Sequence, residues 1–89
     1  MAFIPAQGDV IWIDFDPQLG HEQSGRRPAL VLSLKGYNHR AGLAVLCPIT
    51  KQVKGYIFEA LVPPGFDVTG AILANQVKIT ALIRIQEHG

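Results

Sequence analysis

Short apolar runs alternate along the chain with polar segments that are rich in glycine and proline. The runs contain many β-branched and aromatic residues, which favour strands over helices. We predict strands at residues 10–15, 29–34, 43–47, 56–62 and 71–80, with a sixth candidate at residues 81–85. Residues 35–42 are expected to form a connection with one helical turn, and Pro48 is expected to stop the third strand. Short strands at this spacing predict a mainly β fold with minor α, a small barrel or sandwich.

A polar segment, residues 20–28, separates the first two apolar runs and reads Gly-His-Glu-Gln-Ser-Gly-Arg-Arg-Pro. The two glycines give it backbone freedom at both ends. Pro28 holds the residue before it in an extended conformation and leads the chain into the second strand. A loop that carries a carboxylate, an imidazole and two guanidinium groups between two strands is a typical place for a functional site.

Length and composition narrow the classes of protein that fit this pattern. The 89 residues are expected to form one domain, residues 1–89, and the 48% apolar content excludes a disordered chain. The single cysteine, Cys47, excludes an internal disulfide framework and metal sites with several cysteine ligands. No run approaches the roughly 18 apolar residues of a membrane span, and the N-terminal residues lack the basic region of a signal peptide. We therefore expect a cytoplasmic protein.

The net charge of +1 conceals an uneven distribution of charged side chains. Residues 1–25 contain acidic side chains and no Lys or Arg. Residues 26–58 contain no acidic side chain and carry six cations, Arg26, Arg27, Lys35, Arg40, Lys51 and Lys54. Two interpretations stay open: a basic surface that binds phosphates, or six solvated side chains that point in different directions.

Arg27 and Thr50 form a candidate pair, because each lies at a strand end that is marked by a proline. Arg27 enters the second strand before Pro28, and Thr50 follows Pro48 at the end of the third. If these strands are antiparallel neighbours, the start of one lies beside the end of the other, and the two side chains meet. A guanidinium binds phosphate through two parallel hydrogen bonds, and a hydroxyl adds another donor. The alternative is an ordinary surface arginine and a turn threonine.

The sequence contains no motif for a metal, a nucleotide cofactor or a serine hydrolase. The three histidines, His21, His39 and His88, lack the spacing of metal ligands, and neither serine lies in a nucleophile elbow. We predict no metal and no cofactor.

Taken together, several blocks of the sequence resemble the MazF/PemK family of toxin endoribonucleases. The blocks agree with the family in order and spacing and extend over roughly residues 5–80; they are residues 8–17, 20–23, 25–33, 37–38, 48–50, 54–56, 58–59 and 74–78. Agreement of several blocks is far more specific than one short motif.

The resemblance implies an SH3-like, partly open antiparallel barrel of the plasmid-maintenance-toxin type and a homodimer. It also implies metal-independent cleavage of single-stranded RNA, as in an mRNA interferase, and a cognate MazE/PemI-like antitoxin whose acidic, extended tail occupies the RNA groove. The family's catalytic arginine and threonine match Arg27 and Thr50. Its loop carboxylate matches Glu22, and the neighbouring polar residue matches Gln23.

Elementary chemistry agrees with part of this assignment. RNA supplies its own nucleophile, the 2′-hydroxyl, so the enzyme must stabilise charge on the phosphorane, accept one proton and donate another. Arg27 suits the first role but is a poor base, because arginine side chains stay protonated in proteins. Thr50 can donate to a phosphate oxygen. Glu22 and His21 are both candidates to accept the 2′-hydroxyl proton, and the choice between them stays open.

Further residues are candidates for binding RNA outside the reacting phosphate. Lys51 and Lys54 are expected to hold flanking phosphates, and either Tyr56 or Tyr37 is expected to stack on a base unless it belongs to the core. The remaining candidates are His21, Gln23, Arg26 and Gln76.

The resemblance weakens at the C-terminal end. Family members usually continue past the block at residues 74–78 with a basic segment and a helix, whereas residues 79–89 contain no amphipathic helix. The C-terminal helix is therefore expected to be missing, and dimerisation is expected to cover the exposed strands.

Two other functions fit the predicted fold. One is a non-catalytic, protein-binding toxin such as the gyrase poison CcdB; that family ends in Trp-Gly-Ile, whereas this chain ends in Glu-His-Gly. The other is an inactive, truncated remnant that still binds antitoxin, which the intact Arg27 and Thr50 argue against.

Overall fold

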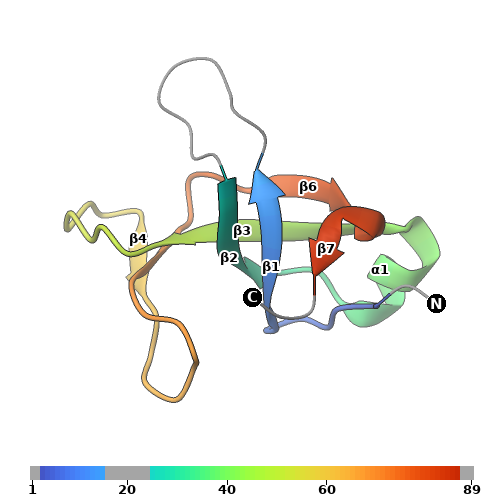
Figure 1. Ribbon diagram of the computed structural model, residues 1–89, viewed down its shortest axis with the longest axis horizontal. Helices are drawn as coiled ribbons and strands as arrows, with labels where there is room; N and C mark the ends of the chain where they lie inside the picture. The colour runs from blue at the N-terminus through green and yellow to red at the C-terminus, as the bar shows by residue number, and fades with distance from the viewer. Residues whose placement is uncertain (1–2, 16–24, 87–89) are drawn as a thin grey trace.

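The computed structural model describes residues 3–15 and 25–86, and these contain seven strands, one α-helix and one 3₁₀ turn. The elements are β1 (Val10–Phe15), β2 (Gly25–Val31), α1 (Lys35–Ala41), β3 (Leu43–Thr50), β4 (Glu59–Leu61), β5 (Ala71–Leu73), β6 (Lys78–Ala81), the 3₁₀ turn η1 (Leu82–Arg84) and β7 (Ile85–Gln86) (Figure 1). The predicted mainly β fold with one short helix is confirmed.

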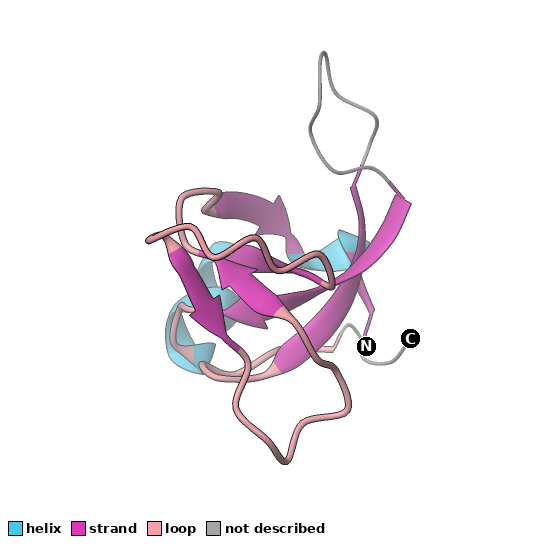
Figure 2. Ribbon diagram, turned by 90° about the vertical axis from the view of Figure 1, so that its left-hand side faces the viewer, coloured by secondary structure: helices cyan, strands magenta, loops and turns pink. Residues whose placement is uncertain are grey.

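The strands form one curled antiparallel sheet in the order β4-β5-β3-β2-β1-β7, which does not close on itself within the described residues. The long strand β3 organises it. Its first half pairs with β6, its last two residues pair with β5, and β2 pairs along the opposite edge. Figure 2 shows the strands curling around a common interior with the helix to one side.

Pro48 does not stop β3, contrary to the prediction from sequence. On one edge, β3 pairs with β6 up to Leu46 and with β5 from Ile49 onward, so Pro48 occupies the interval between two partners. A proline is tolerated there because no ladder hydrogen bond is required from its nitrogen. On the other edge Pro48 pairs with Ala29.

Three other predicted boundaries were wrong. The second strand begins at Gly25 rather than at residue 29, so it includes both arginines. The run at residues 56–62 contributes only Glu59–Leu61 to the sheet, because the residues before it form a loop. The run at residues 71–80 is divided into β5 and β6 by a turn, in which the Gln76 N–H donates to the Leu73 carbonyl at 3.0 Å.

The core lies on one face of β1, β2 and β3, following the two-residue period of strands. Its buried members are Ile11, Ile13, Ala29, Val31, Ala44, Leu46, Leu82 and Ile85, with Phe3 and Ile4 packed against them. On β2 the same alternation puts Arg27 on the face of Ala29 and Val31, at the start of the strand. On β3 it puts Thr50 on the face of Leu46 and Pro48, at the end of the strand. Each of these two polar residues therefore ends a row of core-facing positions.

The helix α1 is fixed to the N-terminal segment by one buried side chain. Asn38 donates from Nδ2 to the Pro5 carbonyl at 2.9 Å and accepts a hydrogen bond from the Ser33 hydroxyl. Gly42 ends the helix in the left-handed conformation, at φ 69°, and its N–H donates to the Asn38 carbonyl at 3.0 Å.

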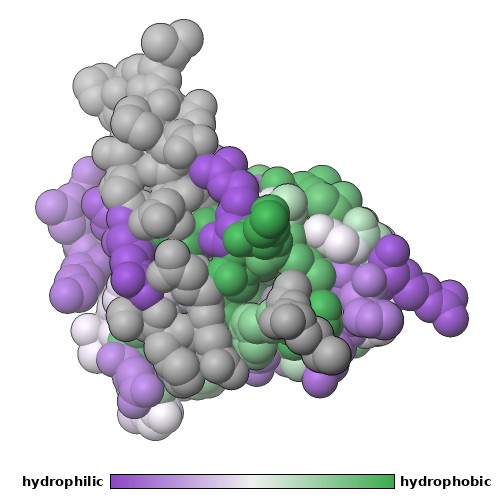
Figure 3. Space-filling model, turned by 45° about the vertical axis from the view of Figure 1, so that its right-hand side comes forward, coloured by the Kyte–Doolittle hydropathy of each residue, from purple (hydrophilic) through white to green (hydrophobic). Residues whose placement is uncertain are grey.

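Figure 3 shows the molecule with the right-hand side of Figure 1 turned toward the viewer. Apolar side chains gather on this face. Two strongly exposed residues come from the C-terminal elements: Ile79 on β6 is 66% exposed and Ile83 on η1 is 89% exposed. Across residues 3–15 and 25–86, no helix has the length and apolarity needed to cross a membrane.

Candidate functional site

Strands β2 and β3 bring Arg27 and Thr50 to the same end of the strand pair. The two strands are antiparallel, as predicted, with Ala29 opposite Pro48 and Val31 opposite Leu46. The pairing ends at Ala29 and Pro48. Arg27 and Thr50 each lie two residues beyond it, so the alternation of both strands puts them on the same face as Ala29 and Pro48. The Leu32 N–H donates to the Val45 carbonyl at 2.8 Å, so that pair is hydrogen-bonded. Counting back by alternation makes Ala29–Pro48 a non-hydrogen-bonded pair, in which facing side chains lie closest.

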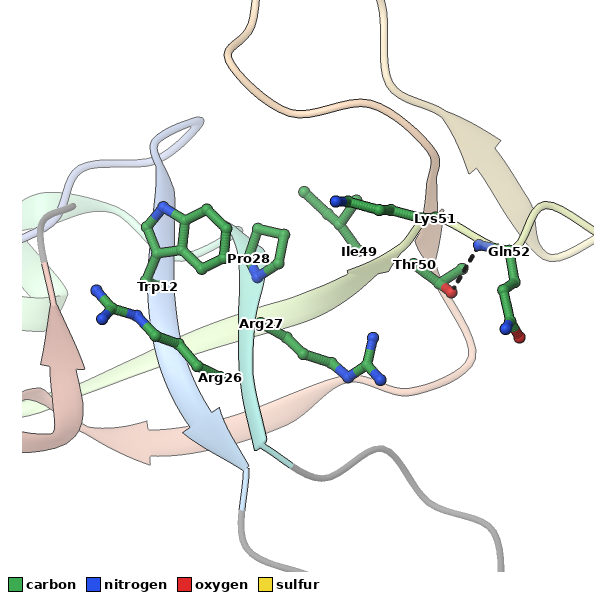
Figure 4. Close-up of a pocket in the computed structure, with 8 residues that line it drawn as sticks. All are labelled: Trp12, Arg26, Arg27, Pro28, Ile49, Thr50, Lys51 and Gln52. Carbon is green, nitrogen blue, oxygen red and sulfur yellow. Dashed lines mark hydrogen bonds between the residues drawn. The ribbon is translucent and has the colours of Figure 1, made fainter. Parts of the chain in front are cut away.

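Arg27 and Thr50 line the same cleft, which has a volume of about 410 Å³. We call it the cationic cleft; its lining residues are Trp12, Arg26, Arg27, Pro28, Ile49, Thr50, Lys51 and Gln52 (Figure 4). The residues come from β1, β2, the end of β3 and the two positions after it. Figure 4 shows the Arg27 side chain extending from β2 toward the end of β3.

The charge of this cleft has one sign. Of the eight described residues that line it, three are cations, Arg26, Arg27 and Lys51, and none is acidic. The Arg26 guanidinium carbon lies 5.7 Å from the centre of the Trp12 ring, within the range of a cation–π contact. Arg27 is half-buried, whereas Arg26 and Lys51 are exposed. The cleft is therefore suited to an anion that carries an apolar or aromatic group.

Thr50 is the buried polar residue of the cleft, with 6% of its surface exposed. Its Oγ1 accepts a hydrogen bond from the Gln52 N–H at 3.1 Å. That contact uses an oxygen lone pair and leaves the hydroxyl's own proton for donation. Thr50 is thus held in place by the following turn while it retains a donor for a ligand.

Gly70, which the sequence analysis does not name, packs against the backbone of Thr50. A β-carbon on Gly70 would stand 2.0 Å from the Thr50 carbonyl oxygen, and the φ of Gly70 is +125°. Real β-carbons do not approach backbone so closely, so this position requires glycine. The Gly70 carbonyl also accepts a hydrogen bond from the Val62 N–H at 2.9 Å, which fixes it to the end of β4.

Three predicted RNA-binding residues, Lys54, Tyr56 and Gln76, line a second hollow instead of the cationic cleft. This hollow has a volume of about 170 Å³, and we call it the aromatic cavity. It is lined by Thr50, Gln52, Lys54, Tyr56, Phe58, Glu59, Leu73 and Gln76. Thr50 and Gln52 border both hollows, so the two are adjacent. Tyr37, the alternative to Tyr56, lies on α1 and lines neither of them.

The six cations of residues 26–58 divide between the two interpretations that the sequence left open. Arg26, Arg27 and Lys51 line the cationic cleft, and Lys54 lines the aromatic cavity next to it. Lys35 and Arg40 lie exposed on the helix α1. The basic surface is therefore built by the strand ends and the loop after β3.

The remaining predicted residues, His21, Glu22 and Gln23, lie outside the described residues. The identity of the general base stays a prediction.

Sequence reasoning missed Trp12, Gln52 and Gly70. Trp12 had a usable signal, because Ile11 and Ile13 on either side of it are buried in the core. In an alternating strand the residue between them faces the other way, so the pattern places the Trp12 side chain outside the core. Gln52 and Gly70 act through a backbone N–H and a backbone contact, for which residue type gives little signal.

The chain matches a protein family over residues 6–88, that of the PemK-like, MazF-like toxins of type II toxin–antitoxin systems. It is 48% identical over 79 residues to the endoribonuclease toxin MazF of Escherichia coli K12, a match that covers 89% of this chain and 70% of that protein.

Solved structures agree with this match. The crystal structure of MazF from Deinococcus radiodurans, form I, has a TM-score of 0.86 and 42% identity, and the match covers 96% of this chain and 79% of that chain. A MazE–MazF complex from the same organism, form II, has a TM-score of 0.81 and 42% identity, covering 96% and 78%. The fold implied by the sequence resemblance is confirmed.

Proposed function

Because this chain belongs to the PemK-like, MazF-like toxin family, we propose that it is a toxin endoribonuclease. It cleaves single-stranded RNA at short sequences, requires no metal ion, and is neutralised by a cognate antitoxin. The observation that supports this proposal is that Arg27 and Thr50 line one cleft together with two further cations, Arg26 and Lys51. RNA is a polyanion with a phosphate at every nucleotide, and such a cleft attracts it.

The reaction assigned to the cleft is attack by the substrate's own 2′-hydroxyl on the neighbouring phosphorus. A bond forms between the 2′-oxygen and phosphorus, and the bond between phosphorus and the 5′-oxygen breaks. A base takes the 2′-hydroxyl proton, and the leaving 5′-oxygen gains a proton. The products are a 2′,3′-cyclic phosphate and a 5′-hydroxyl.

Within this scheme each residue of the cleft has a distinct role. Arg27 stabilises the charge that develops on the non-bridging oxygens, with a planar fork that matches two of them. Thr50 donates its hydroxyl proton to a phosphate oxygen, because its Oγ1 is already oriented by the Gln52 N–H. Arg26 and Lys51 bind flanking phosphates. Glu22 and His21 are the candidates for the base.

The cognate antitoxin is proposed to compete for the same surface. The relative MazF from Deinococcus radiodurans has been solved in complex with MazE. A cleft with three cations and no acidic residue among its described lining suits an extended acidic segment as well as it suits RNA. Such a segment blocks cleavage by occupying the cleft.

A homodimer is the proposed assembly. The apolar surface seen in Figure 3 is of the kind that a second subunit covers. Ile79 on β6 and Ile83 on η1 are strongly exposed apolar residues and add to the apolar surface of the molecule.

The direct experiment incubates the purified protein with a long natural RNA in the presence of EDTA and maps the cut ends by sequencing. Cleavage at a short recurring sequence is expected, and Arg27→Ala is expected to abolish it. An uncut RNA, or cuts that persist unchanged in the Arg27→Ala variant, would contradict the proposal.

A further inference from the structure

The orientation of Trp12 is determined by its two neighbours in β1. Ile11 and Ile13 are buried in the core, 1% and 2% exposed, so the alternation of the strand puts the Trp12 side chain on the opposite face. There Trp12 lies half-buried across from Pro28 of β2 and lines the cationic cleft. Because both of its neighbours are anchored in the core, its ring forms a fixed wall on the β1 side of the cleft.

The same alternation separates the two adjacent arginines of β2. Arg27 shares the face of the buried Ala29. Arg26 takes the other face, two residues before Pro28 and therefore diagonal to Trp12. The Arg26 guanidinium carbon lies 5.7 Å from the centre of the Trp12 ring. Figure 4 shows Arg26 extending toward Trp12 and Arg27 extending toward the end of β3. The cleft therefore presents its two guanidinium groups at two separate places.

The contact with the ring matters because Arg26 is exposed. An exposed arginine side chain samples many rotamers, and the entropy lost in fixing one of them opposes the binding of a phosphate. Attraction to an aromatic face restricts these rotamers before any ligand is present. It acts on the charge of the guanidinium and does not need a particular N–H group. Trp12 thus lowers the entropy that Arg26 loses when it binds an anion.

From this geometry we propose that Trp12 is a positioning residue for RNA binding. Its ring holds Arg26 on the β1 side of the cationic cleft, where the guanidinium binds a phosphate that flanks the reacting one. Arg27 binds the reacting phosphate itself, together with Thr50. This assignment rests on the proposed function and adds to it a residue that acts on RNA affinity through Arg26 and does not act on the chemical step.

A double-mutant cycle tests the coupling of Trp12 to Arg26. Single-turnover cleavage of one RNA is measured against protein concentration, which gives a half-saturating concentration and a maximal rate. The proteins compared are the wild type, Trp12→Leu, Arg26→Ala and the double variant. Trp12→Leu is expected to raise the half-saturating concentration on the order of two- to fivefold, the size of an exposed cation–π contact, and to change the maximal rate far less. In the Arg26→Ala background the same substitution should have no effect, because the group that Trp12 positions is absent.

Further variants separate positioning from a structural role. Trp12→Phe keeps an aromatic face and should restore most of the affinity that Trp12→Leu loses. Phe66→Leu is the matched control and should equal the wild type, because Phe66 is also a partly exposed aromatic residue but does not line the cationic cleft. Far-UV circular dichroism checks the fold of each variant. Where Trp12→Leu does not fold, Trp12→Met takes its place in the same cycle, since it also lacks the aromatic face.

The outcomes distinguish this assignment from the proposed function. If the substitution of Trp12 weakens RNA binding equally with and without Arg26, the assignment is overturned. It is also overturned if RNA affinity is unchanged or if only the maximal rate falls. All three results leave the endoribonuclease intact. A wild-type protein that cuts no RNA overturns the proposed function and the assignment with it.

Discussion

Gly70 lies against the backbone of Thr50 so closely that no side chain fits between them. A β-carbon on Gly70 would stand 2.0 Å from the carbonyl oxygen of Thr50 and 2.8 Å from its carbonyl carbon. Thr50 also pairs with Ala71, the next residue after Gly70. Thr50 is the proposed hydrogen-bond donor to the phosphate. Its backbone position is therefore set by Gly70, a residue without a side chain.

Replacing Gly70 tests this support. We predict that Gly70→Ala displaces the backbone at Thr50 and lowers the cleavage rate by at least tenfold, on the order of one misplaced transition-state contact. Gly65→Ala is the matched control, because Gly65 also has positive φ, +104°, but a β-carbon there would meet no atom within 4 Å. It carries only the backbone strain of about 1 kcal/mol.

The fold of both glycine variants is checked through Cys47, whose thiol is buried and whose pKa is raised by that burial. A raised pKa leaves less thiolate at neutral pH, so alkylation of Cys47 in the folded protein is slow. Equal rates of cleavage in Gly70→Ala and Gly65→Ala, with Cys47 protected in both, would show that Thr50 does not depend on Gly70.

A second prediction concerns the geometry of the Arg27 side chain. Arg27→Lys keeps the positive charge and loses the planar fork, so the rate of RNA cleavage is expected to fall on the order of 100-fold. Thr50→Val removes one neutral donor and should be less damaging than Arg27→Ala. Arg40→Lys, on the exposed helix α1, serves as the control and should match the wild type. Single-turnover rates measure the effect; an Arg27→Lys enzyme at full rate would rule out a bidentate role.

A third prediction concerns salt and the antitoxin. With the three cations of the cationic cleft on phosphates, the logarithm of RNA affinity should fall with that of salt concentration at a slope of about −2. Arg26→Ala should make that slope shallower by about 0.7, whereas Arg40→Ala should leave it unchanged. An acidic antitoxin peptide should displace the RNA with a similar dependence on salt. An RNA affinity that does not change with salt concentration would show that the RNA does not bind in the cationic cleft.

A fourth prediction concerns assembly. Light scattering at micromolar concentration should give the mass of a dimer. Ile83→Glu should shift that mass toward the monomer, because it replaces a strongly exposed apolar side chain with a charged one. Leu61→Glu alters an exposed apolar residue on β4 and is expected to remain dimeric. A monomeric wild-type protein would refute the prediction.

The sequence predicted that β2 and β3 are antiparallel neighbours better than it predicted where these strands begin and end. The proximity of Arg27 and Thr50 was expected from two proline-marked strand ends. Strands β2 and β3 are antiparallel neighbours, as this expectation requires, and both residues line the cationic cleft. The predicted end of β3 was wrong, because the prediction used residue type alone and stopped the strand at Pro48. Whether proline interrupts a strand depends on which neighbour needs its nitrogen, and here β3 changes partners at that residue.

Other features lay beyond the reach of sequence patterns for similar physical reasons. The requirement for glycine at position 70 arises from a contact with a strand twenty residues earlier, which no local pattern records. The loop that lines the aromatic cavity is held by Glu59, the first residue of β4, whose carboxylate accepts hydrogen bonds from the backbone of that loop. Residue type alone does not predict this role. The predicted base, Glu22 or His21, lies outside the described residues.

The measurement that tests the mechanism most directly uses an RNA with a single deoxynucleotide at the cut position, with the protein in excess. If the substrate's 2′-hydroxyl is the nucleophile, this RNA binds as tightly as the unmodified one and is not cut. The unmodified RNA yields a 2′,3′-cyclic phosphate and a 5′-hydroxyl under the same conditions. Cleavage of the deoxy-substituted RNA at the same position would contradict the account and identify water as the nucleophile.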